Sequence, residues 1–571
     1  MNVVGIHDGH NASAAVLVDG QVIAAVQEER LTGVKNFHGC PTLAIAEVLR
    51  LSGLTWSAID EVALHSRHMP VARTRDELLE HYRTVGKPSG RLRALLRRTP
   101  VNHLYRQRRR ASRMNALRAG GVPLAKVIEV DHHEAHASAA YYGSPFRDGP
   151  VLVLTCDGAG DDLCATVSVA NGLSIERRSA IPEADSIGNV YALVTFLLGM
   201  VPNEHEYKLM GMAPYAPDEG VRRSRAVFDR MLVFAADGSP SWGRGPGVPP
   251  TYYSLAWLKA NLEFHRFDWI CGGVQQWTED WLVEWVRRAI ATTGIRRVAL
   301  AGGVFMNVKA NQRILEMPEV ESLFVFPSCG DESNAIGAAY ARTAVHFRTQ
   351  GRSPESIPSI RDVYWGADIG EAEIEAAIRP LASTCRVERV PDIEGRVAEL
   401  LALGNVVARC KGRMEFGARA LGNRSILADP AQWQVVREIN DMIKNRDFWM
   451  PFACSMLADQ QHEYIRNPKN VPSPFMILAF PSAARIDEFR AGAHPYDLTV
   501  RPQTVTDDAN PDFARLIRHF ATRTGKSVIL NTSFNLHGFP MVSGAREALH
   551  VFQSSGLKYL ALGDVLLSKP A

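Results

Sequence analysis

The stretch VLVLTCDGAGDDLCATVSVANGLSI (residues 151–175) decides the fold, because apolar runs alternate in it with a polar loop and a turn. Residues 151–155 and 165–169 predict two strands, since β-branched and apolar residues favour strands while Gly and Asp favour the loop between them. Asn171-Gly172 is a typical hairpin turn, after which 173–175 returns as a third strand.

The same pattern opens the chain. Residues 2–6 (NVVGI) predict a strand, a polar loop covers 7–13, and Asp19-Gly20 separates two further apolar runs. A repeat of this kind predicts a duplicated α/β domain. Actin-like and sugar-kinase-like folds use such a duplication to hold a nucleotide between two lobes; the alternative is two unrelated hairpins.

Size and composition favour a cytoplasmic globular protein. The chain has 571 residues, 46% of them hydrophobic, which is enough for two to four domains. Eight scattered Cys without a CxxC pair favour reduced thiols. The N-terminus begins directly as a strand, so we expect no signal peptide, and the longest apolar run, 190–201, is too short to span a membrane.

The segment 67–118 is strongly basic, with 15 Arg and Lys against three acidic residues. Such a segment can bind nucleic acid or an anionic ligand. The alternative is a solvated helical insertion, with a stripe made by Leu92, Leu95, Leu96 and Leu104. Aromatic residues for base stacking are sparse, so we favour the insertion and expect neither a nucleic-acid nor a membrane partner.

A metal site is indicated by DHHEAHASAA (131–140), which can open a helix. His132 and His136 are four residues apart and share one helical face, which supplies half of a metal site. By itself this pair can arise by chance. Asp157 and Asp331 each follow a predicted strand, where open α/β sheets place their sites. Two His and two Asp suit Fe(II), Mn(II) or Zn(II).

The polar, Pro-bearing segment 351–362 predicts a linker between domains 1–350 and 363–571. In the second domain, KGRMEFGARALGNRSIL (411–427), Lys444-Asn-Arg446 and LNTSFNLHG (530–538) combine Lys, Arg, Ser and Asn with few carboxylates. This composition predicts a pocket for a polyphosphate or acyl phosphate. The alternative is a basic surface patch.

These motifs, together with HHEAHA (132–137), KLMGMAPY (208–215), AGGVFMNVKANQ (301–312) and GDESNAIGAAY (330–340), resemble the NodU/CmcH-type O-carbamoyltransferases. The resemblance runs in order from about residue 3 to 565. It implies an α/β protein with a duplicated actin-like (ASKHA) N-terminal domain, similar to the tRNA threonylcarbamoyl transferases (TsaD-like). It also implies a YrdC-like α/β C-terminal domain.

The resemblance implies a two-step reaction. Carbamoyl phosphate and ATP, with Mg(II), would give carbamoyl adenylate in the C-terminal domain. The carbamoyl group would then pass, in the N-terminal domain, to a hydroxyl of a small molecule, expected to be a secondary metabolite or antibiotic. The alternatives are a tRNA-modifying enzyme of the threonylcarbamoyl type and a non-catalytic, nucleotide-switched binding protein.

Site residues are carried over from the same motifs. His132, His136, Asp157 and Asp331 match the metal ligands, where iron is expected, and His10 and Lys35 match catalytic positions, His10 as general base. Gly302, Gly303, Asn307 and Asn334 would hold the adenylate. Carbamoyl phosphate and ATP would be held by Lys444, Arg446, Asn531, Ser533, Asn535, Arg419, Asn423, Arg424, Ser425 and Arg501. Asn11 and Asn36 depart from the family pattern, so the acceptor stays open, as does the oligomeric state, a homodimer being one option.

Overall fold

The structure, a computed structural model, describes residues 1–68, 74–85, 100–381 and 384–570. The chain forms two compact units. Unit 1 comprises Met1–Glu28 and Asn36–Ile360, and unit 2 comprises Glu29–Lys35 and Arg361–Ala571. Leu92, Leu95 and Leu96 of the expected helical stripe lie outside the described residues, and Leu104 is exposed.

Residues 29–35, which we had assigned to the N-terminal domain, belong to unit 2 instead. Arg30 of helix α1 (Glu28–Thr32) makes one of the contacts that join this segment to unit 2. Its side chain is buried and donates a hydrogen bond to the carbonyl oxygen of Gly417. A local sequence pattern does not reveal a partner almost 400 residues away.

The first sheet of unit 1 has the order β3-β2-β1-β4-β5. Strands β1, β2 and β3 pair antiparallel, and β4 and β5 run parallel to β1. The five strands are β1 (Asn2–His7), β2 (Ser13–Val18), β3 (Gln21–Gln27), β4 (Glu61–His65) and β5 (Val127–Val130).

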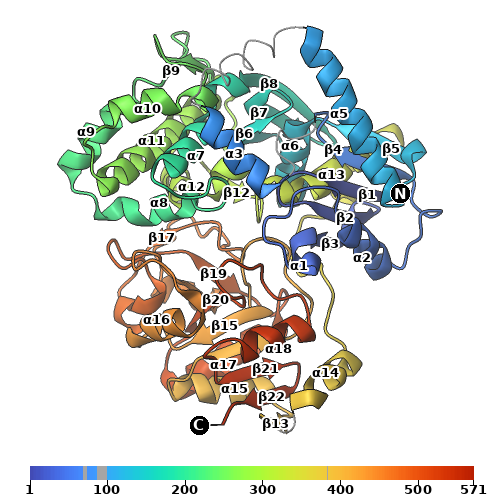
Figure 1. The fold of residues 1–571 in the computed structure, drawn as a ribbon, viewed down its shortest axis with the longest axis vertical. Coiled ribbons are helices and arrows are strands. Elements are labelled where there is room, and N and C mark those ends of the chain that lie inside the picture. The colour runs from blue at the N-terminus through green and yellow to red at the C-terminus, as the bar shows by residue number, and fades with distance from the viewer. Residues whose placement is uncertain (69–73, 86–99, 382–383, 571) are drawn as a thin grey trace. The chain divides into compact units, whose positions relative to one another are not determined.

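The second sheet of unit 1 repeats this topology in the order β8-β7-β6-β11-β12 (Figure 1). Here β6, β7 and β8 pair antiparallel, and β11 and β12 run parallel to β6. The predicted duplication is therefore confirmed. The strands are β6 (Val151–Gly160), β7 (Leu163–Asn171), β8 (Ser174–Pro182), β11 (Arg297–Ala301) and β12 (Ser322–Val325).

Two helices, α6 (His132–Gly143) and α13 (Asn334–Thr349), pack against each other and α13 also packs against β1. Glycines make this approach possible. A Cβ on Gly337 would lie 2.0 Å from the carbonyl oxygen of Ala135, and one on Gly5 would lie 1.8 Å from that of Ala335. Because these backbones touch, the two sheets and the two helices form one tightly packed core.

Of the other helices of unit 1, α2 (Thr42–Ser52) packs on the first sheet and α7 (Ile187–Leu197) on the second, and several others pack on helices. The longest, α11 (Phe267–Thr293), packs against α9 (Asp218–Phe228). A short hairpin joins β9 (Leu232–Phe234) to β10 (Trp242–Arg244). The remaining helices are α3 (Arg75–Val85), α5 (Pro100–Ala119), α8 (Glu206–Met212), α10 (Leu255–Asn261) and α12 (Val308–Glu316).

Unit 2 is built on an eight-stranded mixed sheet in the order β13-β22-β21-β14-β15-β20-β16-β19. Alternate residues of its central strands face opposite sides, as pleating requires. Val407 packs on one side with residues of α15 (Ile393–Ala402) and α17 (Pro511–Thr524), while Ala408 packs on the other with residues of α16 (Gln434–Ile439) and α18 (Ala545–Gln553). Helices thus cover both faces of the sheet.

The strands of this sheet are β13 (Arg386–Arg389), β14 (Val407–Cys410), β15 (Arg424–Ala428), β16 (Ala453–Leu457), β19 (Pro502–Val505), β20 (Val528–Ser533), β21 (Tyr559–Leu562) and β22 (Val565–Ser568). A separate two-stranded pair joins β17 (Phe480–Pro481) to β18 (Thr499–Val500). The helices are α14 (Glu371–Ile378), α15 (Ile393–Ala402), α16 (Gln434–Ile439), α17 (Pro511–Thr524) and α18 (Ala545–Gln553). Among the described residues, no helix is both long and apolar enough to cross a membrane.

Candidate metal centre and anion site

The four predicted metal ligands come together in unit 1. Helix α6 begins after Asp131, whose carboxylate accepts a hydrogen bond from the backbone N–H of Glu134 (3.1 Å). This start places His132 and His136 one turn apart. Asp157 lies near the end of β6, and Asp331 opens the turn before α13. One ligand atom from each of the four lies within 4.8 Å of the others.

The carboxylates of Asp157 and Asp331 give this cluster an excess of negative charge. His136 Nε2 lies 3.1 Å from Asp157 Oδ2 and 3.4 Å from Asp331 Oδ1, and His132 Nε2 lies 3.6 Å from both carboxylates. Burial lowers the pKa of His136, but the two carboxylates outweigh burial and raise that pKa to about 9. A proton on His136 therefore supplies the positive charge that a metal ion would bring.

The donor set fits a divalent transition metal. His132 Nε2 and Asp331 Oδ1 are buried, and neither has a hydrogen-bond partner in the described part of the chain. A buried polar atom without a partner is costly, so both atoms call for a ligand. Two imidazole nitrogens and two carboxylate oxygens suit iron, manganese or zinc, and the described residues show no cysteine in the cluster.

The residues predicted to hold an adenylate divide into two groups. A Cβ on Gly303 would lie 3.1 Å from Asp157 Oδ1, and Asn334 Nδ2 lies 3.0 Å from His136 Nε2. Gly302 has a φ of 105°, which favours glycine, and packs on the backbone of Cys156. These three lie at the metal cluster. Asn307 instead caps α12 by accepting from the N–H of Ala310 (3.1 Å).

A chain of buried histidines, which the sequence analysis missed, leads to the metal cluster. The neighbouring parallel strands β1 and β4 end at His7 and His65. His7 Nδ1 lies 2.7 Å from His65 Nδ1, and His65 Nε2 lies 2.9 Å from His132 Nδ1. Burial lowers the pKa of His7 and holds that of His65 well below the ordinary value. Two strands that both end in His were a signal available in the sequence.

His10, the predicted general base, lies beside a second histidine that was not predicted. The rings of His10 and His38 are 4.9 Å apart. Burial, helped by His10 and His7, lowers the pKa of His38 to about 3. The carbonyl oxygen of His10 is also 2.6 Å from His7 Nε2. His10 thus contacts the histidine chain through its backbone and leaves its imidazole beside His38.

Unit 2 holds a group of positive charges around the buried Lys444. Lys444 ends a π-helical turn (Asn440–Lys444), a feature frequent at functional sites. Its ammonium donates to Ser533 Oγ (3.1 Å) and to Asn535 Oδ1 (2.7 Å). In the described chain, every hydrogen-bond partner of the Lys444 ammonium is a neutral oxygen.

The shifts in the pKa values of Lys444 and Arg501 show which cations lie near these two side chains. Burial, with the nearby charges of Arg446 and Lys35, holds the pKa of Lys444 well below its ordinary value. Burial, with Arg419 and Arg446, does the same for Arg501. Lys35, which we had placed in the N-terminal domain, therefore acts electrostatically on Lys444 in unit 2.

The remaining predicted residues of this domain make contacts within the 411–425 segment and its neighbours. Arg424 donates to the carbonyl oxygens of Gly412 (2.8 Å) and Ser543 (3.1 Å). Ser425 Oγ accepts from the N–H of Gly422 (3.0 Å), Asn423 Nδ2 donates to the carbonyl oxygen of Arg413 (2.8 Å), and Asn531 Nδ2 donates to Ser455 Oγ (2.9 Å). These side chains hold the shape of the segment.

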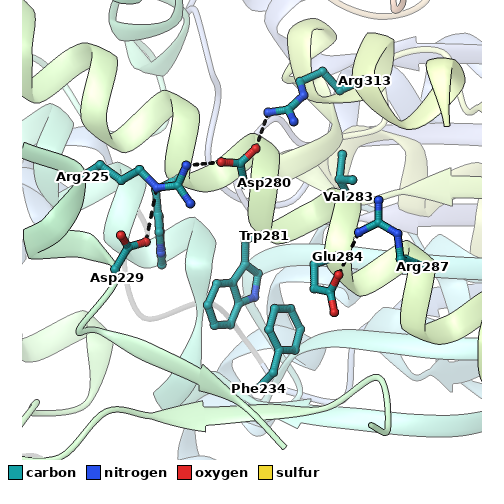
Figure 2. A pocket seen from close by; sticks show the side chains of 10 residues that line it. Arg225, Asp229, Phe234, Asp280, Trp281, Val283, Glu284, Arg287 and Arg313 are labelled. Carbon is teal, nitrogen blue, oxygen red and sulfur yellow. Dashed lines mark hydrogen bonds and ion pairs between the residues drawn. The ribbon is translucent and has the colours of Figure 1, made fainter. Parts of the chain in front are cut away.

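A further pocket of about 410 Å³ lies along α11 and contains none of the predicted site residues. Figure 2 shows Asp280 between Arg225 and Arg313, with which it forms ion pairs, and the ring of Trp281 beside that of Phe234. The two rings are stacked with centroids 4.1 Å apart. The charged groups in the middle of this pocket, Asp280, Arg225 and Arg313, are therefore already paired with one another.

Comparison with known proteins identifies the family. Residues 2–228 and 258–340 match the family described as Carbamoyltransferase N-terminus, and residues 398–569 match Carbamoyltransferase C-terminus. The nodulation protein NolNO of Sinorhizobium fredii (strain NBRC 101917 / NGR234) is 31% identical over 570 residues, which cover 99% of this chain and 79% of that protein.

The name of a second relative states the reaction of that protein. The 3'-hydroxymethylcephem-O-carbamoyltransferase of Amycolatopsis lactamdurans is 30% identical over 270 residues, 46% of this chain and 47% of that protein. Among solved structures, full-length HypF in the phosphate- and nucleotide-bound form has a TM-score of 0.32 and 12% identity, over 60% of this chain and 55% of that chain. With both family domains matched in order, this chain belongs to the carbamoyltransferase family and is a carbamoyltransferase, as its resemblance to the NodU/CmcH-type enzymes predicted.

Proposed function

We propose that this protein is an ATP-dependent O-carbamoyltransferase that works in two steps, one in each unit. Unit 2, with a YrdC-like fold, forms carbamoyl adenylate. Unit 1, with an actin-like fold, transfers the carbamoyl group to a hydroxyl of a small molecule. The repeated sheet topology of unit 1 supports the actin-like assignment.

The first step joins two anions. Carbamoyl phosphate, ATP and one water balance to carbamoyl adenylate, phosphate and pyrophosphate. Phosphates of both substrates repel each other, and a group of fixed cations offsets that repulsion. We assign this role to Lys444, Arg446 and Arg501, with Arg419 and Lys35 beside them. Mg(II) would accompany ATP.

In the second step the acceptor oxygen attacks the carbamoyl carbon, the bond from that carbon to the adenylate phosphate breaks, and AMP leaves. We propose that the imidazole of His10 takes the hydroxyl proton. Gly302, Gly303 and Asn334 would hold the adenylate beside the metal cluster, since all three lie there.

His132, His136, Asp157 and Asp331 would hold a divalent metal, for which we propose Fe(II). When bound, the metal supplies Lewis-acid polarisation of the carbamoyl oxygen. The chain's own residues fix the ligand geometry, because both histidines lie on one helix, Asp157 lies near the end of β6 and Asp331 lies in the turn that follows β12 of the same sheet.

The observation that carries the proposal is the environment of Lys444. A buried ammonium with only neutral oxygen partners in the described chain, beside further cations, is unfavourable unless an anion binds there. A phosphate group would restore the charge balance. In a carbamoyltransferase, carbamoyl phosphate and ATP are the anions that this reaction requires.

The basic segment of unit 1 does not favour the alternative, tRNA modification. Three arginines of α5 are paired with carboxylates of the same unit: Arg106 with Asp162, Arg110 with Glu129 and Arg113 with Asp8. An arginine whose charge is balanced by a neighbouring carboxylate attracts a phosphate backbone less strongly. We therefore propose that α5 has a structural role and that the partner is a small molecule.

The test is release of pyrophosphate from carbamoyl phosphate and ATP. Lys444→Ala should lower the rate about 100-fold or more, since removing one preorganised charge from such a site has effects of this order. Lys558→Ala, an exposed lysine of unit 2, is the matched control and should release pyrophosphate as the wild type does. Wild-type release by Lys444→Ala would overturn the assignment.

The acceptor requires a separate experiment. The name of the cephem carbamoyltransferase suggests hydroxylated antibiotics as the first compounds to try. The protein, carbamoyl phosphate, ATP and Fe(II) are incubated with a panel of hydroxylated metabolites, and mass spectrometry is used to find the gain expected when H is replaced by CONH₂. A panel without any such gain, with pyrophosphate still released, would point away from small hydroxylated acceptors.

A further inference from the structure

Three imidazoles link a backbone carbonyl to the metal cluster. The contacts run from the carbonyl oxygen of His10 to His7 Nε2 (2.6 Å), from His7 Nδ1 to His65 Nδ1 (2.7 Å), and from His65 Nε2 to His132 Nδ1 (2.9 Å). Each ring therefore uses both of its nitrogens. The last nitrogen along this path, His132 Nε2, is the one that faces Asp157 and Asp331.

The carbonyl at the start of the chain determines where the hydrogens lie. A carbonyl oxygen only accepts, so His7 Nε2 must carry a hydrogen. A neutral His7 then accepts at Nδ1, which makes His65 Nδ1 a donor. A neutral His65 accepts at Nε2, so His132 Nδ1 is a donor as well. A neutral His132 is left with a lone pair on Nε2.

The opposite arrangement is disfavoured by burial. If either His7 or His65 were doubly protonated, the hydrogen bond between His65 and His132 would reverse and His132 Nε2 would carry a hydrogen, which leaves that nitrogen no lone pair for a metal. His7 and His65 are 0% and 2% exposed. The guanidinium of Arg113 also donates to the backbone oxygen of His65 (2.5 Å), and this nearby charge opposes a second positive charge on the ring.

We propose that His7 and His65 are positioning residues that fix the tautomer and orientation of His132, so that its Nε2 lone pair points at the metal. The inference rests on the proposed metal centre. It assigns the two histidines no contact with substrate. It also gives the backbone of His10, at the predicted base, a second role as the fixed end of the chain.

Metal affinity of the full-length protein is the first readout, measured anaerobically with Fe(II) against a chromogenic chelator. His65→Leu, which cannot accept from His132, should weaken binding about 10–100-fold, the usual cost of removing such an outer partner. His65→Gln retains a side-chain carbonyl that can accept, and should recover most of the loss. Binding by His65→Leu at the wild-type affinity would overturn the proposal.

Two control variants separate this inference from the metal centre itself. His10→Ala keeps the backbone carbonyl, so its metal affinity should equal that of the wild type even though the proposed base is gone. His132→Ala removes a ligand and should bind far more weakly. If His132→Ala binds normally, the metal centre is wrong; if His65→Leu binds normally while His132→Ala does not, the histidine chain is wrong.

A second measurement reads the tautomer in the wild-type protein, and a variant serves only to assign the signal. Nitrogen NMR of histidine side chains in the metal-free wild type reports which ring nitrogen carries hydrogen. His132 should be identified, by the loss of its signal in His132→Gln, in the Nδ1–H form when it is neutral. A neutral His132 in the Nε2–H form would contradict the proposal.

Discussion

Gly160 lies where the imidazole of His132 leaves no room for a side chain. A Cβ built on Gly160 would be 2.0 Å from His132 Cγ, well inside van der Waals contact. Gly160→Ala should therefore tilt or displace the ring and lower metal affinity, at a cost in stability of about 1–3 kcal/mol for overpacking. Metal titration and thermal unfolding measure the two effects.

Gly243→Ala is the matched control, because a Cβ there meets nothing within 4 Å and the residue also lies in a strand of unit 1. It should bind metal like the wild type. Equal metal affinity in Gly160→Ala and Gly243→Ala would show that the contact with His132 does not position that ligand.

At the scale of single residues, the sequence indicated some groups much better than others. His132 and His136 were visible as a pair because helical spacing relates them locally. Asp157 and Asp331 were visible because each follows an apolar strand. His7 and His65 were not, since their contact depends on two strands 58 residues apart becoming neighbours. Lys35 was assigned to the wrong unit for the same reason, because its neighbours lie in distant sequence.

Helix α6 carries both histidine ligands, and its N-terminus is held by one residue. Asp131 accepts from the N–H of Glu134 (3.1 Å) and from Arg177 Nη2 (2.6 Å). Asp131→Ala should lower the free energy of unfolding by about 1 kcal/mol, the usual cost of losing a cap. It should also weaken metal binding, because the first turn contains His132.

Asp131→Asn tests the capping role directly. The amide oxygen can still accept from Glu134, so most of the stability should return although the charge facing Arg177 is lost. Chemical denaturation followed by tryptophan fluorescence measures both variants. If Asn is as destabilising as Ala, the ion pair with Arg177 matters more than the cap.

The duplicated sheets of unit 1 could be predicted because two stretches of the chain, 2–26 and 151–175, carry one pattern of apolar runs, loops and turns. The strand order of unit 2 could not. In that sheet β14 lies beside β21, about 150 residues later, and no local pattern specifies the pairing. The close approach of α6 and α13 could not be predicted either, because the need for glycine at position 337 depends on its contact with Ala135, which is distant in sequence.

Stability as a function of pH is a property of the whole molecule, to which Glu394 of α15 contributes strongly. Its carboxylate contacts Arg409 (3.3 Å), Lys411 (2.9 Å) and Arg515 (2.7 Å) and is 1% exposed. Burial raises the pKa of Glu394, but the three cations outweigh burial and lower that pKa to about 2. The folded state therefore binds the proton less readily than the unfolded chain.

The direction of the pH dependence follows from the lower pKa of Glu394 in the folded state. The stabilisation by Glu394 is complete above the unfolded-state pKa of about 4.3 and is lost as the pH falls towards 2. Glu394→Gln should be less stable at neutral pH by about 3–5 kcal/mol, because Arg409 stays buried without its partner. The gap between variant and wild type should shrink below about pH 4.3. Urea denaturation across pH tests this, and a constant gap would contradict it.

The two units carry different functional groups, and we propose that each unit catalyses a different step of the reaction. Unit 1 holds the carboxylates and imidazoles of the candidate metal site, and unit 2 holds a group of cations around the buried Lys444. A defect in one unit should therefore leave the half-reaction of the other intact. This separation is the central claim, and it does not depend on the identity of the acceptor.

The most direct test is release of pyrophosphate from carbamoyl phosphate and ATP in a single turnover, with His132→Ala and Lys444→Ala compared side by side. We expect release close to the wild-type rate in His132→Ala, since its defect lies in the transfer step, and almost complete loss in Lys444→Ala. Equal loss in both variants, or release that survives only in Lys444→Ala, would contradict the division of the reaction between the two units.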